Sequence, residues 1–412
     1  MTHRASDRDA NLVAPAFVRV ARALACVACI AALAACGGAG GGSANAPAAS
    51  SNLGPAAQLG EKIFRDTTLS ASGKLACISC HDPANGHASP FDTPVTMGGP
   101  NLDQPGTRTS PSLRYLRFNT PFSFASDGAP AGGFFWDGRA NTLAEQARAP
   151  FLNPFEMANP DVAAVVAKLA SAPYASQFRA VFGDGIFSDS EAAFDRARFA
   201  LERYQREDAV FASFNSKYDA FIAGRTTLAP QELNGFALFN RPDKGNCAAC
   251  HPSAKPVNAP GALFTDFTYD NLGVPRNPAI PANADPAYRD GGLCGMGRPD
   301  LAARNDLCGA FKVPTLRNVA LRKHFFHNGR LKTLEDAVTF YVKRDTNPEI
   351  WYSTDALGNV TPYDDLGERE RGNVNTTEGP YNRRRGEAPA LTDAEIQDLV
   401  AFLRTLTDGW AP

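Results

Sequence analysis

The stretches Cys77-Ile78-Ser79-Cys80-His81 and Cys247-Ala248-Ala249-Cys250-His251 decide the architecture of this chain. A Cys-x-x-Cys-His motif is the attachment signal of a c-type haem: the two thiols add to vinyl groups of the macrocycle, and the adjacent histidine coordinates the iron. A zinc site or a redox dithiol is the competing interpretation. Zinc would use four cysteines together, whereas these pairs lie far apart and each carries its own histidine. The sequence therefore predicts two covalently bound haems c.

Composition and charge narrow the class of protein. The chain has 412 residues, of which 44% are hydrophobic, so it is long enough for two compact domains with their own cores. Its formal net charge is -2, whereas nucleic-acid-binding proteins usually carry a strongly basic face. We therefore expect a globular protein with no nucleic-acid partner.

The N-terminus resembles an export signal. Arg19 and Arg22 precede the apolar run 23–35, which is too short to span a bilayer comfortably and is typical of the core of a secretory signal. The run ends in Leu33-Ala34-Ala35-Cys36, and small residues before a cysteine resemble the lipobox of bacterial lipoproteins. We expect a lipoprotein signal peptide over 1–35, a flexible tether over 36–52, and a periplasmic protein that contacts the membrane only through a lipid anchor at Cys36. An ordinary secretory signal cut near Ala35 is the alternative.

The other cysteines agree with export. Cys26 and Cys29 lie inside the signal, and Cys294 and Cys308 belong to neither haem motif. An exported protein matures in a compartment where disulfides form. We therefore expect a Cys294–Cys308 disulfide that closes the glycine-rich loop between them.

The two halves of the chain repeat each other. Phe134-Phe135-Trp136-Asp137-Gly138-Arg139 matches Phe325-Phe326-His327-Asn328-Gly329-Arg330 at a constant offset of 191 positions. A Gly-x-x-x-Phe segment also precedes each haem motif, at 60–64 and at 235–239. The repeat predicts two cytochrome c-like haem domains, 53–225 and 226–412, related by internal duplication.

The expected fold class is mainly α, with long irregular loops. Apolar residues keep helical spacing over 162–169 and over 194–204. A last helix is predicted from the capping box of Thr392 with Glu395, which precedes an apolar face over 396–403. Strand signals are weak.

The halves differ where a sixth iron ligand would lie. Tyr341 follows the second repeat, and subtracting the offset leads to Pro150, which has no ligating atom. The N-terminal haem should therefore be open to an external ligand, as in peroxidases. Near that slot, Glu156 suits a proton shuttle for peroxide and Gln146 suits a hydrogen-bond donor. The alternative is that Glu156 is an ordinary surface acid.

Trp136 stands where the second half has His327. A buried indole between two haems could relay electrons between them. A tryptophan that simply fills the core is the other interpretation, and the residues alone do not choose between the two.

Several segments together resemble the bacterial di-haem cytochrome c peroxidase family, and its MauG-like branch in particular, over residues 53–410. They are the two haem motifs, Leu59–Phe64, Phe134–Arg139, Glu145–Ala147, Asn153–Met157, Asn271–Pro275 and Phe311–Asn318. The resemblance implies that the His81 haem is the peroxidatic one, with Gln146 and Glu156 in its distal pocket. It also implies that Trp136 bridges the haems electronically and that the His251 haem is the electron-transfer centre.

The resemblance assigns the branch at Tyr341, where ordinary members place a methionine and MauG-like members a tyrosine. Met296 and His324, the other candidates for this ligand, do not fall in the matching slot. A phenolate donor favours higher oxidation states of the iron and lowers its reduction potential.

Two features depart from the family pattern. Many relatives bind calcium through an asparagine, here Thr109, and through a Leu-Thr-x-Pro stretch, where this chain has Arg322 and His324. A cation beside Arg322 would be repelled, which speaks against calcium without settling it. Many relatives also have a blocking histidine in the loop 95–99, which has none here, so we expect the haem to be open without prior reduction. His87 and Met97 are other residues that could reach the iron.

Three functions are compatible with these residues. The first is reduction of hydrogen peroxide with electrons from a small periplasmic cytochrome c or a cupredoxin. The second is MauG-like oxidation of aromatic residues on a partner protein. The third is electron transfer with no catalysis, which predicts that both irons are six-coordinate.

Overall fold

The computed structural model describes residues 52–412 of the chain. The predicted signal peptide, the lipid anchor at Cys36 and nearly all of the tether lie outside these residues. No helix in the described part is long and apolar enough to cross a membrane. The contacts group the described residues into one unit, and the domain limit at 225/226 stays a prediction.

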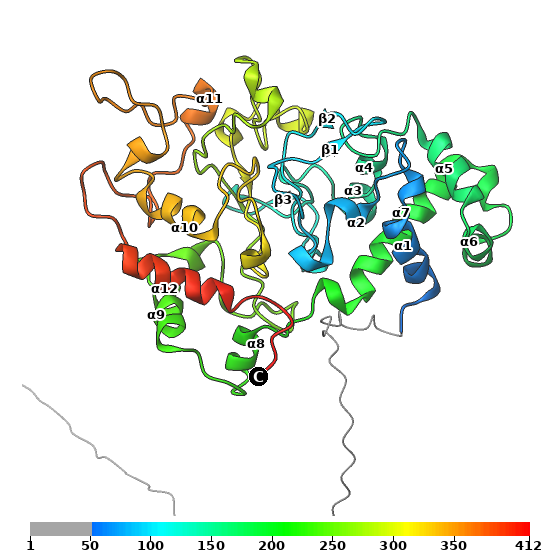
Figure 1. Cartoon of the computed structure of the whole chain (residues 1–412), viewed down its shortest axis with the longest axis horizontal. Helices are drawn as coiled ribbons and strands as arrows, with labels where there is room; N and C mark the ends of the chain where they lie inside the picture. Colours follow the sequence, from blue (N-terminus) through cyan, green and yellow to red (C-terminus); the bar gives the residue numbers. More distant parts are fainter. Residues whose placement is uncertain (1–51) are drawn as a thin grey trace, which may run out of the picture. The chain divides into compact units, whose positions relative to one another are not determined.

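The described chain is mainly helical, as expected, with short antiparallel strand pairs inserted in long loops (Figure 1). The helices are α1 (Pro55–Arg65), α2 (Cys77–Cys80), α3 (Leu143–Gln146), α4 (Arg148–Leu152), α5 (Val162–Ser171), α6 (Ala175–Phe182), α7 (Ser190–Glu207), α8 (Lys217–Ile222), α9 (Pro230–Asn240), α10 (Leu334–Lys343), α11 (Glu368–Arg371) and α12 (Asp393–Arg404). The strand pairs are β1 (Met97–Gly98) with β2 (Gln104–Pro105), β3 (Ser123–Phe124) with β4 (Pro130–Ala131), and β5 (Tyr269–Asp270) with β6 (Phe311–Lys312).

One hydrophobic core lies around α1 and α7, which pack side by side (Figure 1). Gly60 of α1 lies at their crossing, where an added Cβ would come within 2.0 Å of the Ala200 carbonyl oxygen. Only glycine allows the two backbones to approach this closely. Helices α5 and α7 also confirm the predictions over 162–169 and 194–204.

A second core lies around α9 and α12, and it is built in the same way (Figure 1). Gly235 of α9 lies against α12, where an added Cβ would come within 1.9 Å of the Asp398 carbonyl oxygen. The capping box of α12 is confirmed: the Thr392 hydroxyl accepts from the Glu395 N–H at 3.2 Å, and Glu395 Oε2 accepts from the Thr392 N–H at 2.9 Å. In both halves, therefore, the helix before the haem motif packs closely on a later helix, and a glycine at the crossing allows this contact.

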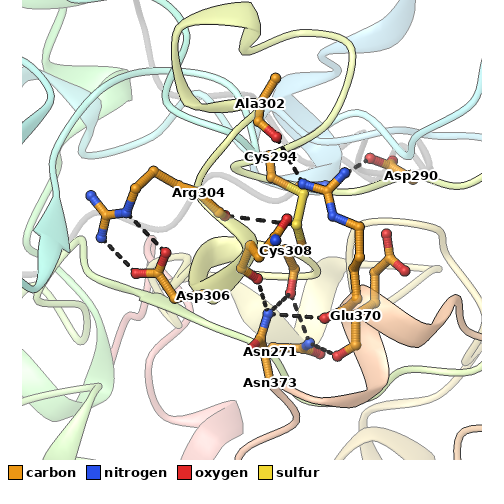
Figure 2. Close-up of a disulfide and its surroundings, with 12 residues drawn as sticks. Asn271, Asp290, Cys294, Ala302, Arg304, Asp306, Cys308, Glu370 and Asn373 are labelled. Atoms are coloured by element: carbon orange, nitrogen blue, oxygen red, sulfur yellow. Dashed lines mark hydrogen bonds and ion pairs between the residues drawn. A yellow bond between two sulfur atoms is a disulfide. The ribbon is translucent and has the colours of Figure 1, made fainter.

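The predicted Cys294–Cys308 disulfide is present, and it anchors a long loop (Figure 2). Asn271 Nδ2 donates to the carbonyl oxygens of Cys308 at 3.1 Å and of Glu370 at 2.7 Å. Asn373 Nδ2 also donates to the Cys308 carbonyl, at 3.2 Å. The disulfide therefore closes the 294–308 loop, and the Asn271 side chain links the Cys308 end of this loop to α11.

Removing this disulfide should destabilise the protein measurably. We expect Cys294→Ala with Cys308→Ala to lower the free energy of unfolding by about 2–4 kcal/mol, because an open loop raises the entropy of the unfolded chain. Urea unfolding of the oxidised wild type and the double variant measures the difference. An unchanged midpoint and slope would contradict the expectation.

Candidate functional site

The first Cys-x-x-Cys-His motif has the local geometry of a haem attachment site. Cys77 and Cys80 lie at the two ends of α2, and neither forms a disulfide. The His81 N–H donates to the Cys77 carbonyl at 2.9 Å, which holds the histidine directly after the thiols. His81 Nδ1 lies 3.1 Å from the carbonyl oxygen of His87, which can only accept, so Nδ1 carries the proton.

Burial lowers the pKa of His81 to about 4, so the imidazole is neutral at physiological pH. With Nδ1 protonated, its lone pair is at Nε2. A neutral imidazole that is oriented by a carbonyl on its other nitrogen is the usual form of a metal-ligating histidine.

The second motif repeats this arrangement. Cys247 and Cys250 form no disulfide, the His251 N–H donates to the Cys247 carbonyl at 2.9 Å, and His251 Nδ1 donates to the Phe264 carbonyl at 2.9 Å. Burial lowers the pKa of His251 as well. Cys247, Cys250 and His251 line a cavity of about 250 Å³ that also reaches Trp136. Free thiols and a neutral, oriented imidazole fit a c-type haem at each motif, and at the second motif the adjoining cavity fits it as well.

Tyr341 lines the same cavity as Cys247, Cys250 and His251. Burial raises the pKa of its phenol, and the nearby Cys250 and Asp270 act in the same direction. Without a cation, the phenol therefore stays protonated, whereas a bound metal ion would favour the phenolate. The Tyr341 ring lies 6.3 Å from the ring of Tyr381, whose hydroxyl donates to Asp270 Oδ2 at 2.8 Å.

Pro150 and Tyr341 occupy matching places on their helices. The Thr142 hydroxyl caps α3 by accepting from the Glu145 N–H at 3.0 Å, and the Thr333 hydroxyl caps α10 in the same way at 3.0 Å. Helix α10 then runs unbroken through Tyr341, whereas the first copy is split between α3 and α4. Pro150 contributes to this difference because it has no N–H to donate to the preceding turn.

Glu156 lies in a tight turn after α4, close to the first pair of thiols. The Gly99 N–H donates to the Glu156 carbonyl at 2.9 Å, and an added Cβ on Gly98 would lie 2.1 Å from the Phe155 carbonyl oxygen, so β1 rests directly on this turn. Burial raises the pKa of both Cys77 and Cys80, and the charge of Glu156 acts in the same direction, which places its carboxyl within electrostatic reach of the two thiols.

Glu156 is an exposed residue, although neighbouring protein atoms desolvate its carboxyl. This desolvation raises its pKa, although the charge of Arg139 and a hydrogen bond to Asn153 oppose the shift. Gln146 ends α3 and is half-buried. Among residues 52–412, Gln146 and Glu156 share no hydrogen bond.

Trp136 links the two halves. It is 7% exposed, its Nε1 donates to the Thr109 carbonyl at 2.9 Å, and its own carbonyl accepts from the Lys312 N–H at 2.9 Å. His327, its counterpart in the second half, accepts through its carbonyl from the Thr109 N–H at 2.8 Å. Both members of this matched pair therefore meet at Thr109.

A buried charge network beside Trp136 was not foreseen from the sequence. Arg108 donates to both carboxylate oxygens of Asp290 at 2.6 Å and to Asp137 at 2.7 Å, and Arg139 donates to Asp137 at 2.8 Å. Burial alone would raise the pKa of Asp290, but Arg108 outweighs it and holds the pKa at about 2. Lys312 Nζ donates to the Gly133 carbonyl at 2.7 Å, and burial lowers its pKa to about 7.

The structure shows where the two other candidate ligands of the first haem lie. His87 is fully buried, accepts from Arg114 Nε at 3.3 Å and packs against Phe211 with ring centroids 4.4 Å apart. Burial lowers its pKa to about 3. Met97 is 43% exposed in β1, next to the turn that carries Glu156.

The residues in the calcium positions of the resemblance do not suit calcium. Within residues 52–412 the Thr109 hydroxyl has no hydrogen-bond partner, Arg322 Nε donates to the His324 carbonyl at 3.2 Å, and His324 Nδ1 pairs with the Gly329 carbonyl at 3.1 Å. A guanidinium there would repel the ion, and calcium prefers six to eight oxygen ligands. Among residues 52–412, no cluster of three or more His, Cys, Asp or Glu side chains could hold a metal ion.

Comparison with known proteins finds consistent relatives. The family model "Di-haem cytochrome c peroxidase" matches residues 55–227. The methylamine utilization protein MauG of Paracoccus denitrificans is 36% identical over 370 residues, which cover 85% of this chain and 88% of MauG. The cytochrome c551 peroxidase of Pseudomonas aeruginosa is 32% identical, with 68% and 70% of the two chains covered.

Among solved structures, the diheme peroxidase BthA of Burkholderia thailandensis superposes with a TM-score of 0.78. It is 42% identical in sequence, and 86% of each chain is covered. The similarity to these proteins therefore extends over most of the chain.

Proposed function

Because this chain belongs to the di-haem cytochrome c peroxidase family, in its MauG-like branch, we propose that it reduces hydrogen peroxide at a haem attached to Cys77, Cys80 and His81. Cys247, Cys250, His251 and Tyr341 would hold a second haem, which would supply electrons to the first. The two haems are the family's cofactors and supply the iron at which peroxide is bound and reduced. The chain's own side chains supply proton transfer and positioning.

One observation carries the proposal: the matching slots at the two sites hold different residues. Pro150 offers no ligand where the other half offers the phenol of Tyr341, and the Glu156 carboxyl lies beside Cys77 and Cys80. An iron site with a free face next to a carboxyl group suits peroxide, which must lose a proton from one oxygen and gain one on the other.

Glu156 is the proposed proton shuttle. Its raised pKa makes it a stronger base than an ordinary glutamate, so it can take a proton from peroxide and return it to the leaving oxygen. Gln146 is proposed to orient the peroxide by a hydrogen bond. Gly98 packs against the turn that carries Glu156, and the Gly99 N–H donates to the Glu156 carbonyl. These contacts favour a fixed position for the carboxyl.

Trp136 is the proposed electron relay between the two haems. Its N–H donates to a backbone carbonyl, which is a very weak base, so an oxidised indole in this place would keep its proton and could be reduced again. Arg108, Asp137 and Arg139 fix the loop that carries it.

Replacing this indole should separate the two half-reactions. We expect Trp136→Phe to slow steady-state turnover with a reduced donor, while the first reaction with peroxide keeps its rate. Trp351→Phe, a half-buried tryptophan without a hydrogen-bond partner at its N–H, is the matched control. Stopped-flow spectroscopy measures both steps, and equal turnover in Trp136→Phe and wild type would contradict the relay.

Location, partners and domain limits complete the proposal. We place the protein in the periplasm, lipid-anchored at Cys36, with the haem domains at 53–225 and 226–412 related by duplication. The matched caps of α3 and α10 and the matched glycines of α1 and α9 support the duplication. The electron donor is a small cytochrome c or a cupredoxin.

Peroxide turnover with such a donor tests the main function directly. The pre-reduced donor is mixed with the holoprotein and hydrogen peroxide, and its oxidation is followed by absorbance. Rapid multiple turnover is expected. If both irons are six-coordinate and the protein does not react with peroxide, it is instead an electron carrier.

A second function is favoured by Tyr341 and by the identity to MauG. In this case the protein uses peroxide to oxidise aromatic side chains of a partner protein, because a phenolate ligand favours high oxidation states at the second haem. Fast reaction with peroxide but little turnover of a reduced donor would support this function over the first.

A further inference from the structure

Arg322 lies at the junction of the two haem sites. It follows the short 3-10 turn Val319–Leu321 and lines the cavity that also contains Cys247 and His251. Its segment also contacts the loop that follows His81, so Arg322 lies near the first haem site as well.

The chain around Arg322 packs directly on the loop that follows His81. Asn85 Nδ2 donates to the Leu321 carbonyl at 3.2 Å. An added Cβ on Gly86 would come within 2.9 Å of the Asn318 side chain. The guanidinium is thus held in a segment that contacts the first site while it faces the cavity of the second.

Arg322 has no carboxylate partner among residues 52–412. The only hydrogen bond of its side chain there runs from Nε to the His324 carbonyl, at 3.2 Å. Desolvation lowers its pKa to about 10, which still leaves it charged at neutral pH. A desolvated charge without a counter-ion raises the free energy of the folded protein. An anion beside Arg322 would lower it, and the described chain supplies no carboxylate there.

Other arginines of the described chain show the contrast. Arg114, Arg317 and Arg344 are buried and pair with Asp408, Asp219 and Asp345. Arg276 and Arg289 also line the cavity without a carboxylate, but each donates to two backbone carbonyls. Of the arginines compared, Arg322 has the fewest side-chain hydrogen bonds and ion pairs, and it lies between the two sites.

We propose that Arg322 pairs with a haem propionate at the junction of the two haem sites and serves there as a built-in cation, so that the holoprotein needs no metal ion at this place. A propionate is a carboxylate, and a guanidinium is the side chain best suited to bind one. The inference rests on the proposed attachment of two haems to this chain. It would also remove the need for calcium beside Thr109, Arg322 and His324.

Four forms of the holoprotein test this proposal: wild type, Arg322→Gln, Arg322→Lys and Arg304→Gln. Arg304 is an exposed arginine of the disulfide loop, paired with Asp306, and is the control for losing one positive charge. Spectroelectrochemical titration gives the reduction potentials of both haems. Thermal unfolding with and without a calcium chelator gives the dependence on metal.

Arg322→Gln should lower the potential of at least one haem by about 59 mV, a tenfold change in the reduction equilibrium, because loss of a nearby positive charge favours ferric iron. Arg322→Lys should keep most of the wild-type potential, and Arg304→Gln all of it. The chelator should change neither the potentials nor the unfolding temperature of the wild type.

Two results would overturn the inference. One is that Arg322→Gln shifts the potentials no more than Arg304→Gln does, and the other is that the chelator lowers the potentials or the stability of the wild type. If Arg322→Gln does not accumulate, the lysine variant and the chelator experiment still decide. Haem content is measured first, by intact mass: a wild type without two covalent haems would overturn the proposed function and the role of Arg322 with it, whereas unchanged potentials in a protein that holds both haems would overturn only the role of Arg322.

Discussion

Glu156→Gln is expected to slow the reaction of the ferric protein with hydrogen peroxide by about 10²–10⁴-fold, the usual contribution of a positioned acid-base group. Glutamine keeps the shape of the side chain and its contacts with the 153–158 turn, but it cannot accept a proton. Stopped-flow mixing with excess peroxide measures the second-order rate constant. Glu191→Gln, an exposed glutamate paired with Arg148, is the control and should react like the wild type.

The pH dependence of this reaction gives a second readout of Glu156. The shuttle must be deprotonated to accept the peroxide proton, so the wild-type rate should fall as the pH falls through the pKa of Glu156. Because burial raises that pKa, the loss should occur at higher pH than for an ordinary glutamate. Glu156→Gln should lack this step. A variant with both the wild-type rate and the wild-type pH profile would exclude Glu156 from the reaction.

Tyr341→Met is expected to raise the reduction potential of the second haem by on the order of 0.1 V, within the roughly 0.8 V range that axial ligands set. The thioether of methionine stabilises ferrous iron, whereas a phenolate stabilises ferric iron. Spectroelectrochemical titration measures the shift. The matched control is Tyr363→Phe, which removes a phenol that is bonded to Asp345 and does not line the cavity.

The two outcomes have different meanings for the second site. A raised potential in Tyr341→Met alone would support the phenol as a ligand of the His251 haem. An unchanged potential, or the same shift in Tyr363→Phe, would mean that Tyr341 is not a ligand. In that case, oxidation of a partner protein would lose its main physical argument.

Features that depend on neighbouring residues in the sequence could be predicted well. The capping box at Thr392, the apolar spacing over 162–169 and the pairing of Cys294 with Cys308 are all confirmed. Each depends on a local hydrogen bond, on helical periodicity or on a small number of cysteines. The haem motifs are also local, so the sequence alone predicts the two attachment sites.

Features that depend on contacts between distant segments could not be predicted. Arg108 and Asp290 are 182 positions apart, and nothing in either segment indicates their bidentate pair. No sequence pattern around Thr109 predicts that its backbone forms hydrogen bonds with both Trp136 and His327. The break between α3 and α4 is not predicted from the sequence either. Pro150 counts there only as a residue without a ligating atom, and not as a helix breaker.

The roles of Glu156, Gln146, Trp136 and Tyr341 stay proposals, and all of them depend on one asymmetry between the haem sites. Electron paramagnetic resonance of the ferric holoprotein tests that asymmetry most directly. We predict one high-spin signal from the open haem at His81 and one low-spin signal from the haem at His251, with both signals lost after addition of peroxide. Two low-spin signals would mean that the first iron already has a sixth protein ligand, and would contradict the account.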